Sequence, residues 1–232
     1  MFLIVIAFIA LVTGFVLQSN ERTKTASIIA KVVGVVMLLV GLASSCIVQI
    51  EAGQVGVPTL FGKVSGRILN SGLNFVNPFV VVKKFDIRTQ NYTMAGQYDE
   101  GDRQGEDAMR VLTSDGLELM LDVSVLYRVV PTEAPKILST IGENYEDVIV
   151  RPIARTKIRD NATSYTAIDL YSIKREEYQQ KVFSNIEKEF RARGMELEQL
   201  LVRNITLPES VKTSIESKIQ AEQDAQKMEF VL

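Results

Sequence analysis

Two long apolar runs at the N-terminus constrain this chain more than any other feature. Residues 1–17 carry no charge, and residues 27–50 carry only Lys31. A helix needs about 20 apolar residues to cross the hydrocarbon core of a bilayer. The first run also lacks the basic start and the small-residue cleavage site of a secretory signal. The sequence therefore predicts a membrane anchor over residues 1–50, a transmembrane helical hairpin with its loop at 18–26. One span plus a segment lying in the membrane interface is the alternative.

Basic residues predict how this anchor is oriented. Arg22, Lys24 and Lys31 lie in or beside the loop. Only two, Lys63 and Arg67, lie early in the part that follows. Because basic loops stay on the cytoplasmic side, the rest of the chain is expected on the non-cytoplasmic side of a bacterial inner membrane or an organellar membrane. The residues predicted to span the bilayer are Phe2, Ile6, Ile9, Val12, Val33, Val36, Leu39 and Val40.

Composition excludes several classes of function. The chain has no histidine, no tryptophan and one cysteine, Cys46. Histidine-dependent catalysis and Cys/His zinc sites are therefore ruled out. A net charge of −2 offers no basis for nucleic-acid binding, and no glycine-rich phosphate loop occurs. We expect no enzyme activity, catalytic residue, metal or cofactor. At Cys46, beside the apolar run, lipidation is one interpretation and an unmodified cysteine is the preferred one.

Residues 51–95 are predicted to form a strand-rich subdomain next to the membrane. Short β-branched segments alternate there with turn residues, a pattern typical of small strands joined by tight turns. These turn residues are Gly53, Gly56, Gly62, Gly66, Gly72 and Pro78. Phe75, Val76, Phe79 and Val80 have two interpretations. They dip into the outer half of the bilayer, or they form a hydrophobic turn under the sheet.

Residues 96–207 are predicted to form a second, α/β subdomain. Ser114-Asp115-Gly116 is a turn signal, and apolar residues alternate on both sides of it over 110–130. This pattern indicates a long hairpin with one face on a core. Four helical segments and a strand are predicted to follow. The first helix is capped by Thr132 and ended by Gly142, and the second runs from Asn144 to about Asp160, with Asn144 and Asp147 as its capping pair. A short segment opened by Thr166 and Asp169, a helix from Ser172 to Gly194 and a strand over 196–205 complete the subdomain.

Two sets of residues are candidates for contacts between subunits. Arg151, Arg155 and Arg159 recur every four residues, so they form a basic stripe on a helix. That stripe is either a solvated face or a partner for acidic residues of a neighbouring subunit. Residues 208–232 are predicted to begin a long assembly helix of the coiled-coil type that continues beyond residue 232. Its narrow apolar stripe consists of Val211, Ile215 and Ile219. A stripe this narrow favours contact with another subunit over packing into the core of the same chain.

Several separated motifs, taken together, resemble one family. They are EAGQVGVPTLFGKV, GLNFVNPFV, TSDGLELMLDVSVLYRV and NITLPESVKTSIESKIQAEQDAQK, behind an apolar anchor. In this order they resemble the SPFH (band 7) family of stomatins, prohibitins, flotillins and the bacterial HflK/HflC proteins. The resemblance covers roughly residues 48–232 and looks closest to prohibitin-like members. The chain departs from many relatives in having two apolar runs rather than one.

The resemblance implies an α+β protein, with an SPFH α/β domain of two subdomains followed by a long assembly helix. It also implies assembly into large rings or cages, as a homo-oligomer or with a paralogue, and association with a membrane-bound AAA protease. The leading hypothesis is a scaffold that organises a membrane microdomain. The alternative is a smaller, stomatin-like oligomer that regulates a channel or transporter. A membrane-associated hydrolase ranks third.

Overall fold

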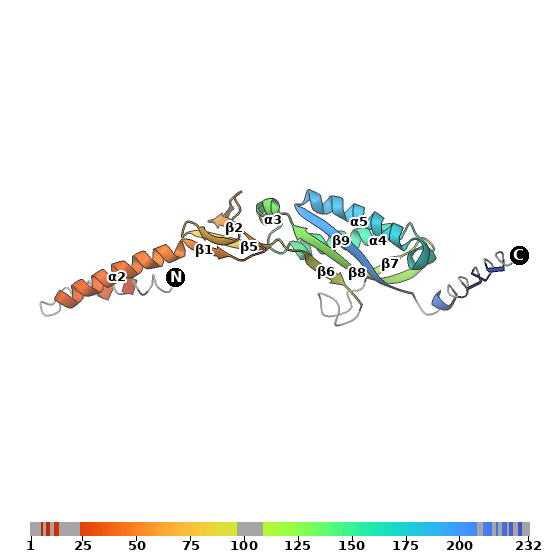
Figure 1. The fold of residues 1–232 in the computed structure, drawn as a ribbon, viewed down its shortest axis with the longest axis horizontal. Coiled ribbons are helices and arrows are strands. Elements are labelled where there is room, and N and C mark those ends of the chain that lie inside the picture. The colour runs from red at the N-terminus through yellow and green to blue at the C-terminus, as the bar shows by residue number, and fades with distance from the viewer. Residues whose placement is uncertain are drawn as a thin grey trace. The chain divides into compact units, whose positions relative to one another are not determined.

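The computed structural model describes residues 24–96 and 109–207 and, outside these ranges, single helical positions at both ends of the chain. Its contacts divide the chain into two compact units. Unit 1 is Met1–Asp86 and unit 2 is Ile87–Leu232. The elements of both are drawn in Figure 1. The predicted boundary at residue 95 is wrong, because the strand at 90–94 pairs within unit 2.

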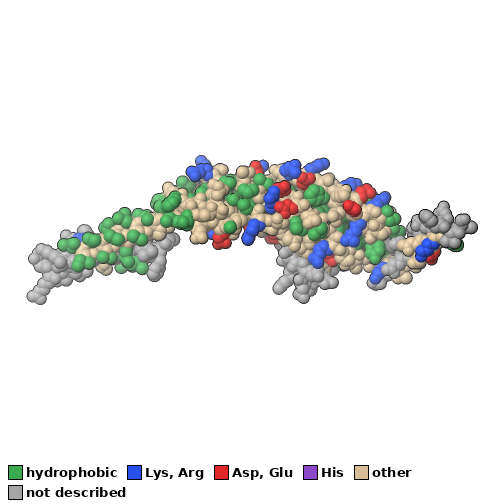
Figure 2. Space-filling model, in the orientation of Figure 1, with side chains coloured by type: hydrophobic (Ala, Val, Ile, Leu, Met, Phe, Trp, Pro, Cys, Tyr) green, Lys and Arg blue, Asp and Glu red, His purple; other side chains and the backbone are tan. Residues whose placement is uncertain are grey.

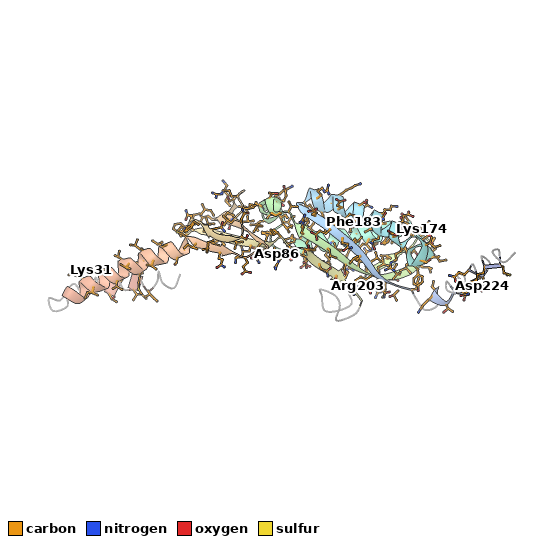
Figure 3. The ribbon with its side chains drawn as sticks, viewed as in Figure 1. Lys31, Asp86, Lys174, Phe183, Arg203 and Asp224 are labelled. Atoms are coloured by element: carbon orange, nitrogen blue, oxygen red, sulfur yellow. The ribbon has the colours of Figure 1, made fainter. Side chains whose placement is uncertain are left out.

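Unit 1 begins its described part with helix α2, Lys24–Ser45. Hydrophobic side chains cover it (Figure 2), and Lys31 is labelled near its start in Figure 3. Val33, Val36, Leu39 and Val40, predicted to lie in the membrane, are all about half exposed in this chain. Of the first run, Ile6, Ile9 and Val12 are exposed helical positions, and Phe2 lies outside the described residues.

No helix within the described residues has both the length and the apolar character required to cross a membrane. The predicted pair of spans is thus not confirmed. The second apolar run also differs from its predicted course, since the helix ends at Ser45 and Ile47–Ile50 is strand β1. Three of the four residues in β1 are β-branched, and a partner strand is available in the same unit.

The rest of unit 1 is the predicted set of small strands. Strand β1 pairs antiparallel with β4, Gly72–Phe75. Strand β2, Gln54–Leu60, pairs antiparallel with β3, Lys63–Val64, and with β5, Val80–Asp86. The buried core between them consists of Ile50, Val55, Val57, Leu69 and Phe85.

Gly56 has a different role from the turn predicted for it. It lies inside β2, where its backbone exchanges hydrogen bonds with Leu69 at 2.8 and 2.9 Å. A Cβ at this position would lie 2.7 Å from both Ile50 Cδ1 and Val82 Cγ1. Glycine is therefore required by close packing at this point, and not by turn geometry.

Unit 2 is built on an antiparallel sheet around one long strand. Strand β8, Glu118–Val129, pairs along one edge with β9, Met195–Thr206. Its other edge pairs with β7, Met109–Leu112, and with β6, Gln90–Met94. The hairpin predicted over 110–130 is confirmed, and its turn is tied to the rest of the unit by Ser114 N, which donates to Tyr165 O at 2.8 Å.

Helices cover the sheet of unit 2 on one face, as Figure 1 shows for α4 and α5. The covering helices are α4, Arg151–Ala162, which contacts β7, and α5, Arg175–Ala192, which contacts β9. Helix α3, Ala134–Thr140, follows β8 in the chain, and π-helical turns lie at Glu146–Val150 and Asp169–Ile173. Along α5, Val182, Ile186 and Phe190 are fully buried. This sheet-and-helix arrangement confirms the α+β class for the described part of the chain.

Three predicted helix starts are wrong. A 3-10 turn at Pro131–Glu133 precedes α3, whose N-cap is Glu133 and not Thr132. The second helix opens as a π-turn at Glu146 without a side-chain cap, so Asn144 and Asp147 form no capping box. Helix α5 begins three residues after Ser172, because the π-turn takes up that segment. The Thr166–Asp169 start is confirmed, since Asp169 N donates to Thr166 Oγ1 at 3.2 Å and Thr166 N to Asp169 Oδ2 at 3.4 Å.

Strand β9 does not keep the simple alternation predicted for it. Its register on β8 shifts between Leu126 and Tyr127 and again between Asp122 and Val123, so Glu198 and Arg203 are extra residues in β9. Each extra residue in a bulge reverses the side chain alternation that follows. The buried residues are consequently Met195, Leu197, Leu200, Val202 and Ile205, and Leu201 is only half-buried.

Candidate membrane-contacting surface

Unit 1 exposes an unusual amount of aromatic surface. We call Phe61, Phe75 and Phe79 the aromatic patch, and their exposed fractions are 87%, 82% and 65%. Large apolar residues beside them in the strands are also exposed, namely Ile47, Leu60, Leu73 and Val81. Exposed aromatic clusters of this kind mark surfaces that bind another apolar surface.

Two turns of unit 1 hold Phe61 and Phe79 together. Phe61 occupies the turn between β2 and β3 with a φ of +47°, beside Gly62 with a φ of +84°. Phe79 follows the Asn77 turn, where Asn77 Oδ1 accepts a hydrogen bond from Phe79 N at 3.0 Å. Because Leu60 pairs with Val80, the two turns lie at the same end of the sheet. The rings stack with centroids 6.3 Å apart at 28°.

Phe75 is held next to the end of helix α2. In the β1–β4 pair, Phe75 lies opposite Ile47, two residues after the helix ends. Val76 N donates to the Cys46 carbonyl at 2.8 Å and extends this connection. Cys46 is half-buried here. Strand pairing therefore places the patch residue Phe75 at the point where the chain leaves the apolar helix.

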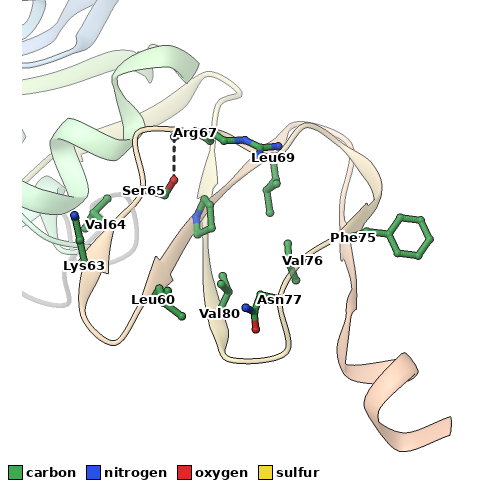
Figure 4. A pocket seen from close by; sticks show the side chains of 11 residues that line it. Leu60, Lys63, Val64, Ser65, Arg67, Leu69, Phe75, Val76, Asn77 and Val80 are labelled. Atoms are coloured by element: carbon green, nitrogen blue, oxygen red, sulfur yellow. Dashed lines mark hydrogen bonds between the residues drawn. The ribbon is translucent and has the colours of Figure 1, made fainter. Parts of the chain in front are cut away.

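A hollow of about 410 Å³ lies between β2, β3 and the segment that leads into β5. Leu60, Val76 and Val80 form apolar parts of its wall (Figure 4). In the same view the Phe75 ring points outward, away from these side chains. Val76 and Val80 are half-buried, unlike the two exposed aromatics predicted to act with them. Lys63 and Arg67 also line the hollow.

Phe61 was not among the predicted membrane-interface residues. The signal for it is present in the sequence, since Phe61-Gly62 separates two apolar segments as a two-residue hairpin loop. A large aromatic side chain in such a loop has no strand face on which to be buried. Phe75 and Phe79 were predicted, but the sequence does not show that Phe79 stacks on Phe61.

The residues predicted to mediate assembly lie in unit 2. Arg151, Arg155 and Arg159 all lie on α4; the first two are half-buried and Arg159 is exposed. On the adjoining helix α5, the carboxylate of Glu189 binds Lys157 Nζ at 3.3 Å and Arg193 at 2.6 Å. Hydrogen bonds from Arg193 and Lys157 hold the pKa of Glu189 below its usual range. Val211 is a half-buried helical position, and Ile215 and Ile219 lie outside the described residues.

Comparison with known proteins adds evidence independent of this geometry. The family model for the SPFH domain / Band 7 family matches residues 48–231, which is most of the chain. The chain belongs to the SPFH domain / Band 7 family. The match begins at Val48, so it includes both sheets of unit 1, apart from Ile47, and the whole sheet of unit 2.

The relatives of this SPFH protein include prohibitins. It is 23% identical over 197 residues to Prohibitin-1 of Colletotrichum higginsianum (83% of this chain, 66% of the relative) and 24% identical over 203 residues to Prohibitin 1 of Drosophila melanogaster (85% and 67%). It is also 27% identical over 192 residues to an uncharacterized protein of Methanocaldococcus jannaschii (82% and 86%). The chain spans about two thirds of the length of these prohibitins.

Proposed function

We propose that this SPFH protein is a membrane-anchored scaffold. Its N-terminal apolar segments insert into the bilayer, and unit 1 rests on the membrane surface through the aromatic patch. Copies of the chain, alone or with a paralogue, assemble into a large ring or cage. This assembly organises a membrane microdomain and controls access to membrane proteins, including a membrane-bound AAA protease.

The observation that carries this proposal is the placement of exposed apolar side chains in unit 1. They occur both on helix α2, where Ile28, Val32, Val36 and Leu39 are exposed by 53–62%, and in the aromatic patch. A water-soluble monomer rarely exposes this many large apolar side chains in neighbouring elements. Aromatic side chains are favoured at the membrane interface, where their rings are removed from water without crossing the bilayer. Membrane contact therefore accounts for α2 and the patch together.

Two measurements on the full chain test the two halves of the proposal. Washing of membranes that contain the protein at alkaline carbonate pH should leave it in the pellet, because inserted apolar segments resist this extraction. Gentle detergent extraction should then yield a particle of megadalton mass. Release by carbonate would contradict insertion. A particle of only a few chains would contradict the cage and favour the smaller, stomatin-like regulator.

The C-terminal stripe supplies a prediction about assembly. Replacement of Ile215 and Ile219 by lysine should shift the extracted particle to smaller species, because two charges would enter an apolar contact between subunits. The matched control is Thr213→Lys with Ser217→Lys, which adds the same charge about half a helical turn away from the stripe. The control should leave the mass unchanged. Equal masses for all three proteins would mean that the stripe makes no subunit contact.

A further inference from the structure

The hollow of unit 1 combines apolar walls with basic side chains. Its volume of about 410 Å³ lies within the range of about 300–1,000 Å³ typical of small-molecule sites. Leu60, Val76 and Val80 come from different strands and turns and line one side of it (Figure 4). Leu69, buried at 7% exposure, closes another side. Such walls suit a hydrocarbon chain.

Lys63 and Arg67 give this hollow a positive charge. Both side chains are exposed, and neither forms an ion pair with any described residue. The surrounding segment 47–86 is basic as well, with four lysines or arginines against two acids, Glu51 and Asp86. The chain as a whole carries a net charge of −2, so this segment has the opposite sign of charge to the whole chain. An anionic group would find two cations there that have no acidic partner to displace.

The position of the hollow also favours a lipid. Phe75 and Val76 belong to its lining, and strand pairing and a backbone hydrogen bond hold these residues beside the end of helix α2. If the patch rests on the bilayer as proposed above, the hollow opens within reach of lipids of the same leaflet. A phospholipid carries both groups that the lining would recognise, an acyl chain and a phosphate.

We propose that this hollow binds one anionic phospholipid. An acyl chain lies against Leu60, Val76 and Val80, and the phosphate binds Lys63 and Arg67. This inference rests on the proposed membrane contact of unit 1, and it adds a specific ligand class and a specific site. A lipid from the adjacent leaflet would fill the hollow. Binding of each subunit would then depend on the content of anionic lipid in the membrane.

Photocrosslinking tests this site in the full chain reconstituted in vesicles. The probes are phosphatidylglycerol and phosphatidylcholine, each with a diazirine on one acyl chain, in vesicles of phosphatidylcholine. We expect phosphatidylglycerol to label peptides containing Leu60, Val76 or Val80 at least several-fold more than phosphatidylcholine does. Lys63→Gln with Arg67→Gln should abolish the difference. Lys83→Gln with Lys84→Gln removes the same charge outside the lining and should preserve it.

The outcomes separate this inference from the proposed function. Equal labelling of unit 1 by the two lipids, or a headgroup preference that survives in Lys63→Gln with Arg67→Gln, would overturn the lipid site while leaving membrane contact intact. No labelling of unit 1 by either lipid would overturn the proposed membrane contact itself. Lys63→Arg with Arg67→Lys keeps both charges and should retain the preference, which guards against a variant that merely misfolds. Displacement of the probe by millimolar inorganic phosphate would show a simple phosphate site and would contradict the lipid assignment.

Discussion

Replacement of Phe190 by alanine is expected to lower the free energy of unfolding of unit 2 by about 3–5 kcal/mol. The ring is fully buried on α5 and packs edge-to-face on Tyr127, with centroids 6.1 Å apart at 75°. Its removal leaves a cavity between the central strand β8 and the helix that covers it. Urea unfolding followed by the tyrosine near-ultraviolet signal measures this loss, since all seven tyrosines of the chain follow residue 86 and report on unit 2 alone.

Phe183 provides the matched control for this prediction. It lies on the same helix but is only half-buried. Phe183→Ala removes the same number of atoms from a site that water already reaches, so the loss should be clearly smaller. Equal losses at the two positions would mean that Phe190 does not pack in the core as described.

Gly194→Ala should cost about 2–5 kcal/mol of stability, from backbone strain and crowding combined. Gly194 ends helix α5 with a φ of +81°, a conformation that side chains disfavour. A Cβ there would also lie 2.5 Å from Glu133 Cβ, an atom fixed to the backbone in front of α3. One of the two segments would have to move. The same urea measurement reports the effect.

Gly116 separates these two causes. Its φ is +77°, but a Cβ at that position would meet no atom within 4 Å. Gly116→Ala therefore carries the strain without the clash, and we expect a loss of about 1–2 kcal/mol. If Gly194→Ala cost no more than Gly116→Ala, the contact between the end of α5 and Glu133 would be wrong.

Local patterns predicted most of unit 2 because its elements follow local rules. The Ser114–Gly116 turn signal and the alternating residues on both sides predict β7 and β8 with the correct buried face. Gly142 and Gly194 end α3 and α5 as predicted, each with a positive φ. Which residues of β9 are buried could be predicted only in part, because its two bulges depend on pairing with β8, a strand far away in the sequence.

The structure of unit 1 could be predicted only in outline. Apolarity alone did not show that the helix stops at Ser45, since β1 forms only by pairing with Gly72–Phe75. Phe75 and Phe79 follow from hydropathy near the predicted anchor, whereas Phe61, which stacks on Phe79, lies at the tip of another hairpin. The hollow could not be predicted at all. Its lining comes from five separate segments that only the pairing of β1 with β4 and of β2 with β3 and β5 brings together.

The proposed function requires that the aromatic patch of unit 1 lies in the membrane interface. A fluorescent probe on Phe79→Cys, in a Cys46→Ser background, tests it in the full chain reconstituted in vesicles. The control is Ala52→Cys, an exposed turn residue of unit 1 beyond the far end of β1, a strand that extends about 13 Å away from the helix end. We predict that a quencher attached to lipid acyl chains quenches the probe at residue 79 strongly and the probe at residue 52 weakly. Equal, weak quenching at both positions, with full access to a water-soluble quencher, would contradict the claim.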